Sequence, residues 1–183
     1  MKKLKVLAIA FLVFFSITMN AEALESKMIT RQNSASAFAS WSEGTLYYMD
    51  LYISETNKNT YIYVEICRKF SCAYGEMYTQ KDVLDISMKL DKATLSPVEM
   101  TVWDYYYDTS EKITIQAEWR GVGKVIKGSS HAISKLGDMT FKYSDSTNSR
   151  DALAIGSMNG NDLKPTKFAG LSKSKLVSMT MEK

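Results

Sequence analysis

The stretch that decides the fold is TLYYMDLYISETNKNTYIYVEIC, residues 45–67. It contains two runs with apolar residues at every second position, joined by the polar turn 55–59. Alternation with a period of two on both sides of a turn predicts an antiparallel hairpin with one buried face. The positions expected to face the core are Tyr47, Met49, Leu51, Ile53, Ile62, Val64 and Ile66. The positions expected on the opposite face are Tyr48, Asp50, Tyr52, Tyr61, Tyr63 and Glu65.

A second hairpin is predicted in VEMTVWDYYYDTSEKITIQAEW, residues 98–119. The alternation places these residues inward: Val98, Met100, Val102, Ile113, Ile115, Ala117 and Trp119. It places these outward: Glu99, Thr101, Trp103, Lys112, Thr114, Gln116 and Glu118. Residues 104–111 then form the connection, because Asp, Thr and Ser favour turns through local side-chain hydrogen bonds. Tyr105, Tyr106 and Tyr107 are therefore expected near a loop tip, with Trp103 just below them on the outer face.

The rest of the chain has the same character, with short runs rich in Tyr, Val, Ile, Thr and Met about ten residues apart, a spacing typical of all-β domains. Further strands are expected at 35–41, 83–89, 139–143, 152–158 and 175–181. Gly121 and Gly123 indicate a bend, and a short helical turn fits 81–85. The prediction is an all-β fold: an antiparallel β-sandwich, jelly-roll-like or Ig-like, with about eight to ten strands in a single domain.

The N-terminus, MKKLKVLAIAFLVFFSITMNAEA, has a basic start, a short apolar run and a small-x-small end. These three features predict a signal peptide over residues 1–23 and a mature domain over 24–183. The apolar run is shorter than the roughly 20 residues that a membrane-spanning helix needs. We therefore expect a secreted or extracytoplasmic protein, with no transmembrane segment in the mature chain.

The net charge makes a nucleic-acid partner unexpected. The whole chain carries +3 at pH 7. Residues 1–23 hold three lysines and one glutamate, which leaves +1 for the remainder. A nearly neutral chain creates no broad positive field for a phosphate backbone. Glycine-rich phosphate loops are also missing, so we expect no nucleotide or other cofactor.

Two cysteines, Cys67 and Cys72, are separated by four residues in CRKFSC. An even number of cysteines in an exported protein favours a disulfide, and this spacing suits a hairpin end. The alternatives are a metal pair, which needs more ligands than lie nearby, and a redox pair, which usually has the C-x-x-C spacing. We predict a structural disulfide.

Several segments resemble a group of small secreted proteins of bacteria and archaea that has no assigned function. The segments are ASAFASWSE, MDLYISE, DKATLSPVEMTVWDYYYDTSEKITIQAEWRGVGK and RDALAIGSMNGNDL. In that group an L-x-x-A-T-L segment precedes a V-x-V-x-D strand, a turn, and a strand that ends W-x-G-x-G. The matching positions here are Leu90, Ala93, Thr94, Leu95, Val102, Asp104, Trp119, Gly121 and Gly123. The resemblance implies one β-rich exported domain and supplies no catalytic residues.

Groups that could carry catalysis are few. The only histidine, His131, lies in GSSHAISK, which is interpreted as a solvated loop, and no G-x-S-x-G elbow accompanies it. Glu65 and Glu118 on outer strand faces are the candidate carboxylates of a glycoside hydrolase. Asp104 and Asp108 are candidate calcium ligands, although the usual EF-hand spacing is absent and turns favour aspartate without a metal. No metal is therefore predicted.

Aromatic side chains are the best candidates for binding, because a ring combines a large apolar area with a polar edge. The candidate binding residues are Trp103, Tyr105, Tyr106, Tyr107, Tyr48, Tyr52, Tyr61 and Tyr63. They favour a non-enzymatic binding module for glycans or a cell-surface protein. A carboxylate-dependent glycoside hydrolase and a structural coat component remain alternatives. The lysines at 164, 167, 173, 175 and 183 are interpreted as protection of an edge strand against aggregation, in preference to contact with an anionic surface.

Overall fold

The computed structural model describes residues 25–43, 45–56, 59–80 and 82–182. The expected signal peptide and the expected first mature residue, Leu24, lie outside this part of the chain.

The described residues form an all-β fold of ten strands without a helix, which confirms the predicted fold class. The strands are β1 (Glu25–Glu43), β2 (Thr45–Thr56), β3 (Thr60–Cys67), β4 (Cys72–Thr79), β5 (Leu84–Ile86), β6 (Lys92–Asp104), β7 (Thr109–Gly121), β8 (Ile126–Leu136), β9 (Met139–Met158) and β10 (Asn161–Glu182). Every pairing between them is antiparallel.

All ten strands belong to one hydrogen-bonded sheet, in the order β10-β1-β2-β3-β4-β6-β7-β9-β8, with β5 attached to β6. Because β10 also pairs with β9, the series of strand pairings that begins at β10 closes on β10 again. The described strands therefore bend one continuous sheet around the core. The expected division into the two sheets of a jelly-roll-like or Ig-like sandwich is not confirmed.

Both predicted hairpins are present with the predicted inward faces. In β2 and β3, the inward residues with described side chains are at most 1% exposed: Met49, Leu51, Ile53, Ile62, Val64 and Ile66. The inward residues of β6 and β7 are also buried: Val98, Met100, Val102, Ile113, Ile115, Ala117 and Trp119. The strands of these two hairpins supply most of one contiguous apolar cluster. Each buried aliphatic side chain in it stabilises the fold by about 1.5–3 kcal/mol. The side chain of Tyr47 lies outside the described set.

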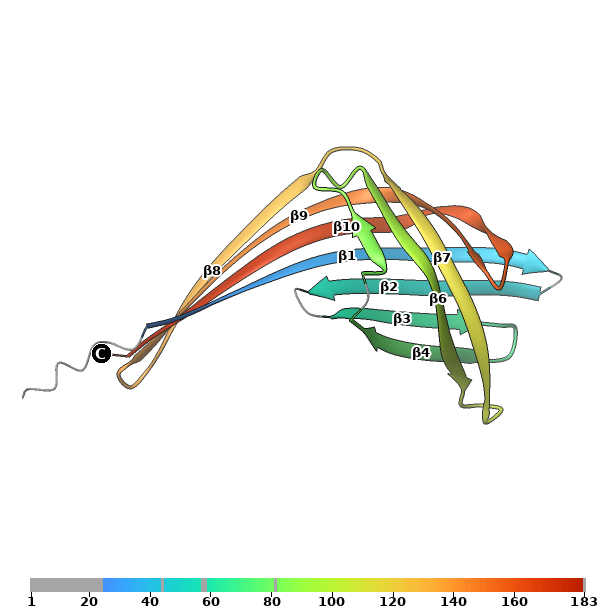
Figure 1. Cartoon of the computed structure of the whole chain (residues 1–183), viewed down its shortest axis with the longest axis horizontal. Coiled ribbons are helices and arrows are strands. Elements are labelled where there is room, and N and C mark those ends of the chain that lie inside the picture. The colour runs from blue at the N-terminus through green and yellow to red at the C-terminus, as the bar shows by residue number, and fades with distance from the viewer. Residues whose placement is uncertain (1–24, 44, 57–58, 81, 183) are drawn as a thin grey trace, which may run out of the picture.

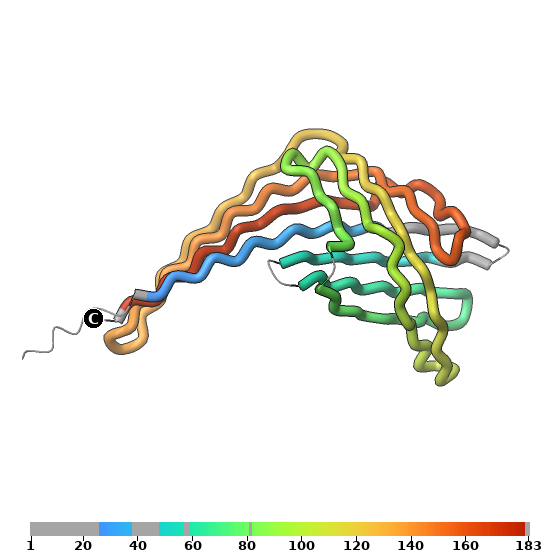
Figure 2. The backbone as a smooth tube through the Cα atoms, in the orientation of Figure 1, coloured from blue at the N-terminus to red at the C-terminus, as the bar shows by residue number. Residues whose placement is uncertain are grey.

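Four strands extend beyond this core as an arm, and Figures 1 and 2 show them leaving the body side by side. The arm consists of residues 25–33 of β1, all of β8, residues 139–149 of β9 and residues 172–182 of β10. Its strand order is β1-β10-β9-β8. Every residue of β8 is exposed, so the arm is a sheet with solvent on both faces.

Three predictions from the sequence are wrong in this region. The segment around His131, interpreted as a loop, is the exposed strand β8. The lysines Lys173 and Lys175 do not protect an edge, because β10 is paired with β1 on one side and β9 on the other. The helical turn expected at 81–85 does not occur in its described part, residues 82–85, where the short strand β5 begins at Leu84 instead.

Candidate functional site

The outer face of β2, β3, β4 and the end of β6 carries a continuous group of aromatic side chains, which we call the tyrosine face. Cross-strand register sets its rows, because residues directly opposite one another in antiparallel strands point to the same side of the sheet. The rows are Ser54–Tyr61–Tyr78, Tyr52–Tyr63–Glu76, Asp50–Glu65–Tyr74–Trp103 and Tyr48–Cys67–Cys72.

The most exposed ring cluster of the tyrosine face is formed by Tyr74, Trp103 and Tyr105. The rings of Tyr74 and Tyr105 are stacked with centroids 5.2 Å apart. Trp103 is tilted against Tyr105 at 6.3 Å. Tyr74 and Trp103 are 39% and 38% exposed, so their rings are held by neighbours and are still accessible to a ligand.

The three consecutive tyrosines do not act as one group. Tyr105 joins the tyrosine face, whereas Tyr106 and Tyr107 make an edge-to-face pair at 4.8 Å in the turn between β6 and β7. Asp104 determines this turn, since its Oδ1 accepts the backbone N–H groups of Tyr106 and Tyr107 at 3.0 and 3.1 Å. The turn, residues 105–108, is shorter than the expected connection.

A second cluster lies on β2–β4, where Tyr61 is 4.9 Å from Tyr78 and 6.5 Å from Tyr52 between ring centroids. The hydroxyl of Tyr61 donates to Glu76, and that of Tyr63 donates to Glu65. Loss of solvent around the ring, followed by Glu76 for Tyr61 and Glu65 for Tyr63, raises the pKa of both phenols. Both phenols are therefore neutral hydrogen-bonding groups at neutral pH.

Sequence reasoning missed Tyr74, Tyr78 and Glu76, although the signal was present. In CAYGEMYT the residues with small or apolar side chains alternate with these three, as in the neighbouring strand. That pattern alone would place them outward. It does not reveal the register, which brings Tyr74 beside Trp103 from a strand 29 positions later.

Two carboxylates of the tyrosine face, Asp50 and Glu65, are direct cross-strand partners. Burial, and to a smaller extent the neighbouring Glu65 charge, raises the pKa of Asp50. Glu118 does not join them. On β7, Ser110 is the cross-strand partner of Trp103. Glu118 lies eight residues further along the same strand, a distance of about 27 Å from Ser110. The structure therefore separates Glu65 from Glu118, the two candidate carboxylates predicted from the sequence, and makes Asp50 the cross-strand partner of Glu65.

Cys67 and Cys72 form the predicted disulfide, with Cα atoms 4.0 Å apart at the end of the β3–β4 hairpin. Glu65, Cys67 and Cys72 bring three potential metal-ligand atoms together, but the disulfide removes the thiolates that would bind a metal. Within the described residues, Asp104 and Asp108 do not join a larger ligand cluster. The oxygens of Asp104 already accept hydrogen bonds from the turn and from Ser71, which favours its structural role.

No family model, curated protein or solved structure matches this chain, so the resemblance to small secreted proteins stays an expectation. Helices long and apolar enough to cross a membrane do not occur in the described residues.

Proposed function

We propose that the protein is an extracytoplasmic, non-enzymatic binding module whose tyrosine face binds a glycan chain. The observation that carries this proposal is the exposed ring cluster of Tyr74, Trp103 and Tyr105 beside the carboxylates of Glu65 and Asp50. Aromatic rings stack on the apolar faces of sugar rings, and carboxylates accept hydrogen bonds from sugar hydroxyls.

The geometry of the face supports an extended ligand. Two ring clusters, around Trp103 and around Tyr61, lie on the same side of neighbouring strands and are connected by Tyr63 and Glu65. Since the cross-strand neighbours hold the rings in place, little side-chain entropy is lost on binding. The disulfide at the edge of this face fits the proposed location outside the cytoplasm.

Binding to a glycan array, followed by calorimetric titration of the best ligand, tests this function. Trp103→Ala and Tyr74→Ala should each weaken binding about tenfold or more, because stacking on one ring contributes on the order of 1–3 kcal/mol. Tyr106→Ala is the matched control, since its ring lies in the turn pair with Tyr107. Unchanged binding in Trp103→Ala and Tyr74→Ala would place the site elsewhere, and equal loss in Tyr106→Ala would show that the effect is not specific to the ring cluster.

Absence of any glycan ligand, combined with retention of a protein ligand that depends on Trp103, would favour the cell-surface protein as partner. Exposed aromatic residues also anchor protein interfaces, so the same variants test the site against either a glycan or a protein ligand. The array should therefore be run beside a panel of extracellular matrix and surface proteins, with Tyr106→Ala again as the control.

A second candidate function, glycoside hydrolysis, is favoured by the Asp50–Glu65 pair. The Cβ atoms of direct cross-strand partners lie about 5 Å apart, which allows the two carboxyl groups to approach the separation of about 5–5.5 Å found in retaining glycosidases. The raised pKa of Asp50 suits a general acid. Turnover of a glycoside that disappears in Asp50→Asn and persists in Glu118→Gln would establish this activity. Tight glycan binding without turnover would exclude it for that ligand.

A further inference from the structure

The arm separates charge between its two faces. The inner face continues from the buried residues Ala35 and Leu171, and register assigns every second residue of each strand to it. Its cations are Lys27, Arg31, Lys127, Lys135, Lys142, Lys173 and Lys175. Among the described side chains, this face of the arm carries no carboxylate. The outer face has no lysine or arginine and consists mainly of Ser, Thr and apolar residues.

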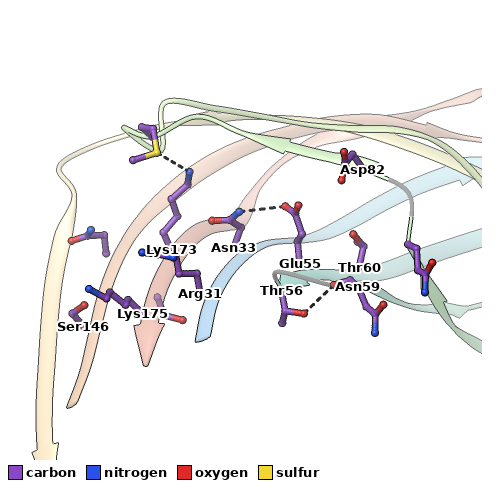
Figure 3. Close-up of a pocket in the computed structure, with 14 residues that line it drawn as sticks. Arg31, Asn33, Glu55, Thr56, Asn59, Thr60, Asp82, Ser146, Lys173 and Lys175 are labelled. Atoms are coloured by element: carbon purple, nitrogen blue, oxygen red, sulfur yellow. Dashed lines mark hydrogen bonds between the residues drawn. The ribbon is translucent and has the colours of Figure 1, made fainter. Parts of the chain in front are cut away.

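A pocket of about 600 Å³ lies where the inner face meets the body. Figure 3 shows Arg31, Lys173 and Lys175 on the side of the arm, with Glu55 and Asp82 on the side of the body. Polar side chains complete much of the lining: Asn33, Asn59, Thr60, Gln80, Ser146 and Asn148. The pocket is therefore basic on one side and rich in hydrogen-bonding groups throughout.

The cationic side has an unfavourable arrangement in the protein alone. Arg31 and Lys175 are direct cross-strand partners, and like charges in that relation repel each other. No described carboxylate lies within salt-bridge distance of either group. Lys173 is held in the pocket differently, since its Nζ donates to the carbonyl oxygen of Ile86 at 3.0 Å. A bound anion would remove the repulsion between Arg31 and Lys175, because both can donate charge-assisted hydrogen bonds to it.

The remaining lining identifies the chemistry of the ligand. Amide and hydroxyl groups match a ligand rich in hydroxyls, and the carboxylates of Glu55 and Asp82 can accept hydrogen bonds from such a ligand. The described residues that line the pocket include no aromatic side chain, so they offer a nucleobase no ring to stack on. Met88 is the only large apolar residue among the described residues of the lining, so a lipid chain would find few apolar side chains to pack against.

We propose that this pocket and the cationic inner face of the arm bind an anionic polysaccharide, with one acidic sugar residue in the pocket and the chain continuing along the arm. The acidic group, a carboxylate or a sulfate, contacts Arg31 and Lys175. The sugar hydroxyls contact Asn33 and Asn148, which flank Lys173 on the neighbouring strands. This site is distinct from the tyrosine face and does not rest on the function proposed for that face.

Titration of the full mature chain with polygalacturonate, monitored by calorimetry, tests the proposal. Arg31→Gln combined with Lys175→Gln should weaken binding about tenfold or more. The matched control is Lys164→Gln combined with Lys167→Gln, which removes the same charge from exposed positions on the body segment of β10. The control should bind within about twofold of wild type. Equal loss in both double variants would overturn the proposal, because binding would then follow net charge alone.

Two further measurements test the saccharide part and exclude misfolding. Asn33→Ala combined with Asn148→Ala keeps the charge and should weaken polygalacturonate binding several-fold; unchanged binding would overturn recognition of the sugar. Neutral dextran should not compete, and DNA or vesicles of anionic phospholipid should bind more weakly than polygalacturonate. Stronger binding of either would overturn the choice of ligand. Trp103→Ala should leave polygalacturonate binding unchanged, and near-wild-type thermal unfolding of each variant shows that it is folded.

Discussion

The indole nitrogen of Trp119 donates a hydrogen bond of 2.8 Å to the carbonyl oxygen of Ser36. Trp119 lies on β7 and Ser36 on β1, two strands that do not pair with each other. The ring is completely buried among the core residues. This contact therefore connects two distant parts of the bent sheet across the interior, and it satisfies the polar atom of the largest buried side chain.

Substitution of Trp119 should reduce stability strongly. Trp119→Phe removes the hydrogen bond and part of the ring volume, and leaving a buried polar group unpaired costs about 1–3 kcal/mol. Trp119→Ala should cost about 3–5 kcal/mol, because it also leaves a large cavity. Urea denaturation measures both free energies of unfolding. Equal stability of Trp119→Phe and wild type would show that the bond to Ser36 contributes little.

Gly75 allows β6 to cross closely over β4. A Cβ atom at Gly75 would lie 2.4 Å from the carbonyl oxygen of Thr101, a contact that requires the backbone to move. Gly75→Ala should therefore destabilise the protein by about 1–3 kcal/mol, the usual range for overpacking. Gly128→Ala is the matched control in β8, where a Cβ atom would meet nothing within 4 Å. A similar loss of stability for both variants, measured by thermal unfolding, would contradict crowding at Gly75 as the cause.

The disulfide should contribute a modest amount to stability. Cys67 and Cys72 enclose a short loop, for which the chain-entropy estimate is about 2 kcal/mol. The double variant Cys67→Ser, Cys72→Ser should lose about that free energy in urea denaturation and keep its far-ultraviolet circular dichroism. Mass spectrometry of the wild-type protein should find no free thiol. Two free thiols in exported protein would contradict the bond.

Alternation predicted the strands that bury one face and failed where neither face is buried. The inward positions of the two hairpins follow from a period of two, because a one-residue shift would move every apolar side chain into water. In β8 no face is buried, so selection for alternating apolar residues is missing. GSSHAISK is exposed on both sides, and its sequence pattern resembles that of a loop. The full lengths of β9 and β10 were missed for the same reason.

The candidate site was only half predictable because it depends on pairing between distant segments. The outward direction of Tyr48, Tyr52, Tyr61 and Tyr63 follows from local alternation. The neighbours of Trp103 do not follow from local alternation. Strands β4 and β6 pair at only two positions, and β5 with its two connections separates them in the sequence. The paired cations Arg31 and Lys175 come from opposite ends of the chain, so no local pattern places them together.

The acid stability of the protein should depend on Asp104. Its Oδ2 accepts a hydrogen bond from Ser71 at 2.5 Å, and its Oδ1 accepts two backbone N–H groups. The Ser71 hydroxyl above all, followed by the backbone N–H groups of Tyr107 and Tyr106, holds the pKa of Asp104 below its ordinary value of 3.8. A carboxyl group whose pKa is lower in the folded state stabilises the fold above the unfolded pKa. That contribution disappears as pH falls through the folded pKa.

Asp104→Asn removes this dependence on pH. The variant should be less stable than wild type at pH 7, and the difference in free energy of unfolding should shrink as the pH falls below 3.8, because wild type alone loses the contribution of an ionised Asp104. Urea denaturation at a series of pH values measures the difference. Asp138→Asn, an exposed carboxylate in the β8–β9 turn, is the control for a change in net charge. A difference between Asp104→Asn and wild type that stays constant from about pH 7 to about pH 2.5 would contradict the assigned role, because linkage requires the difference to shrink once the pH falls below the ordinary value of 3.8.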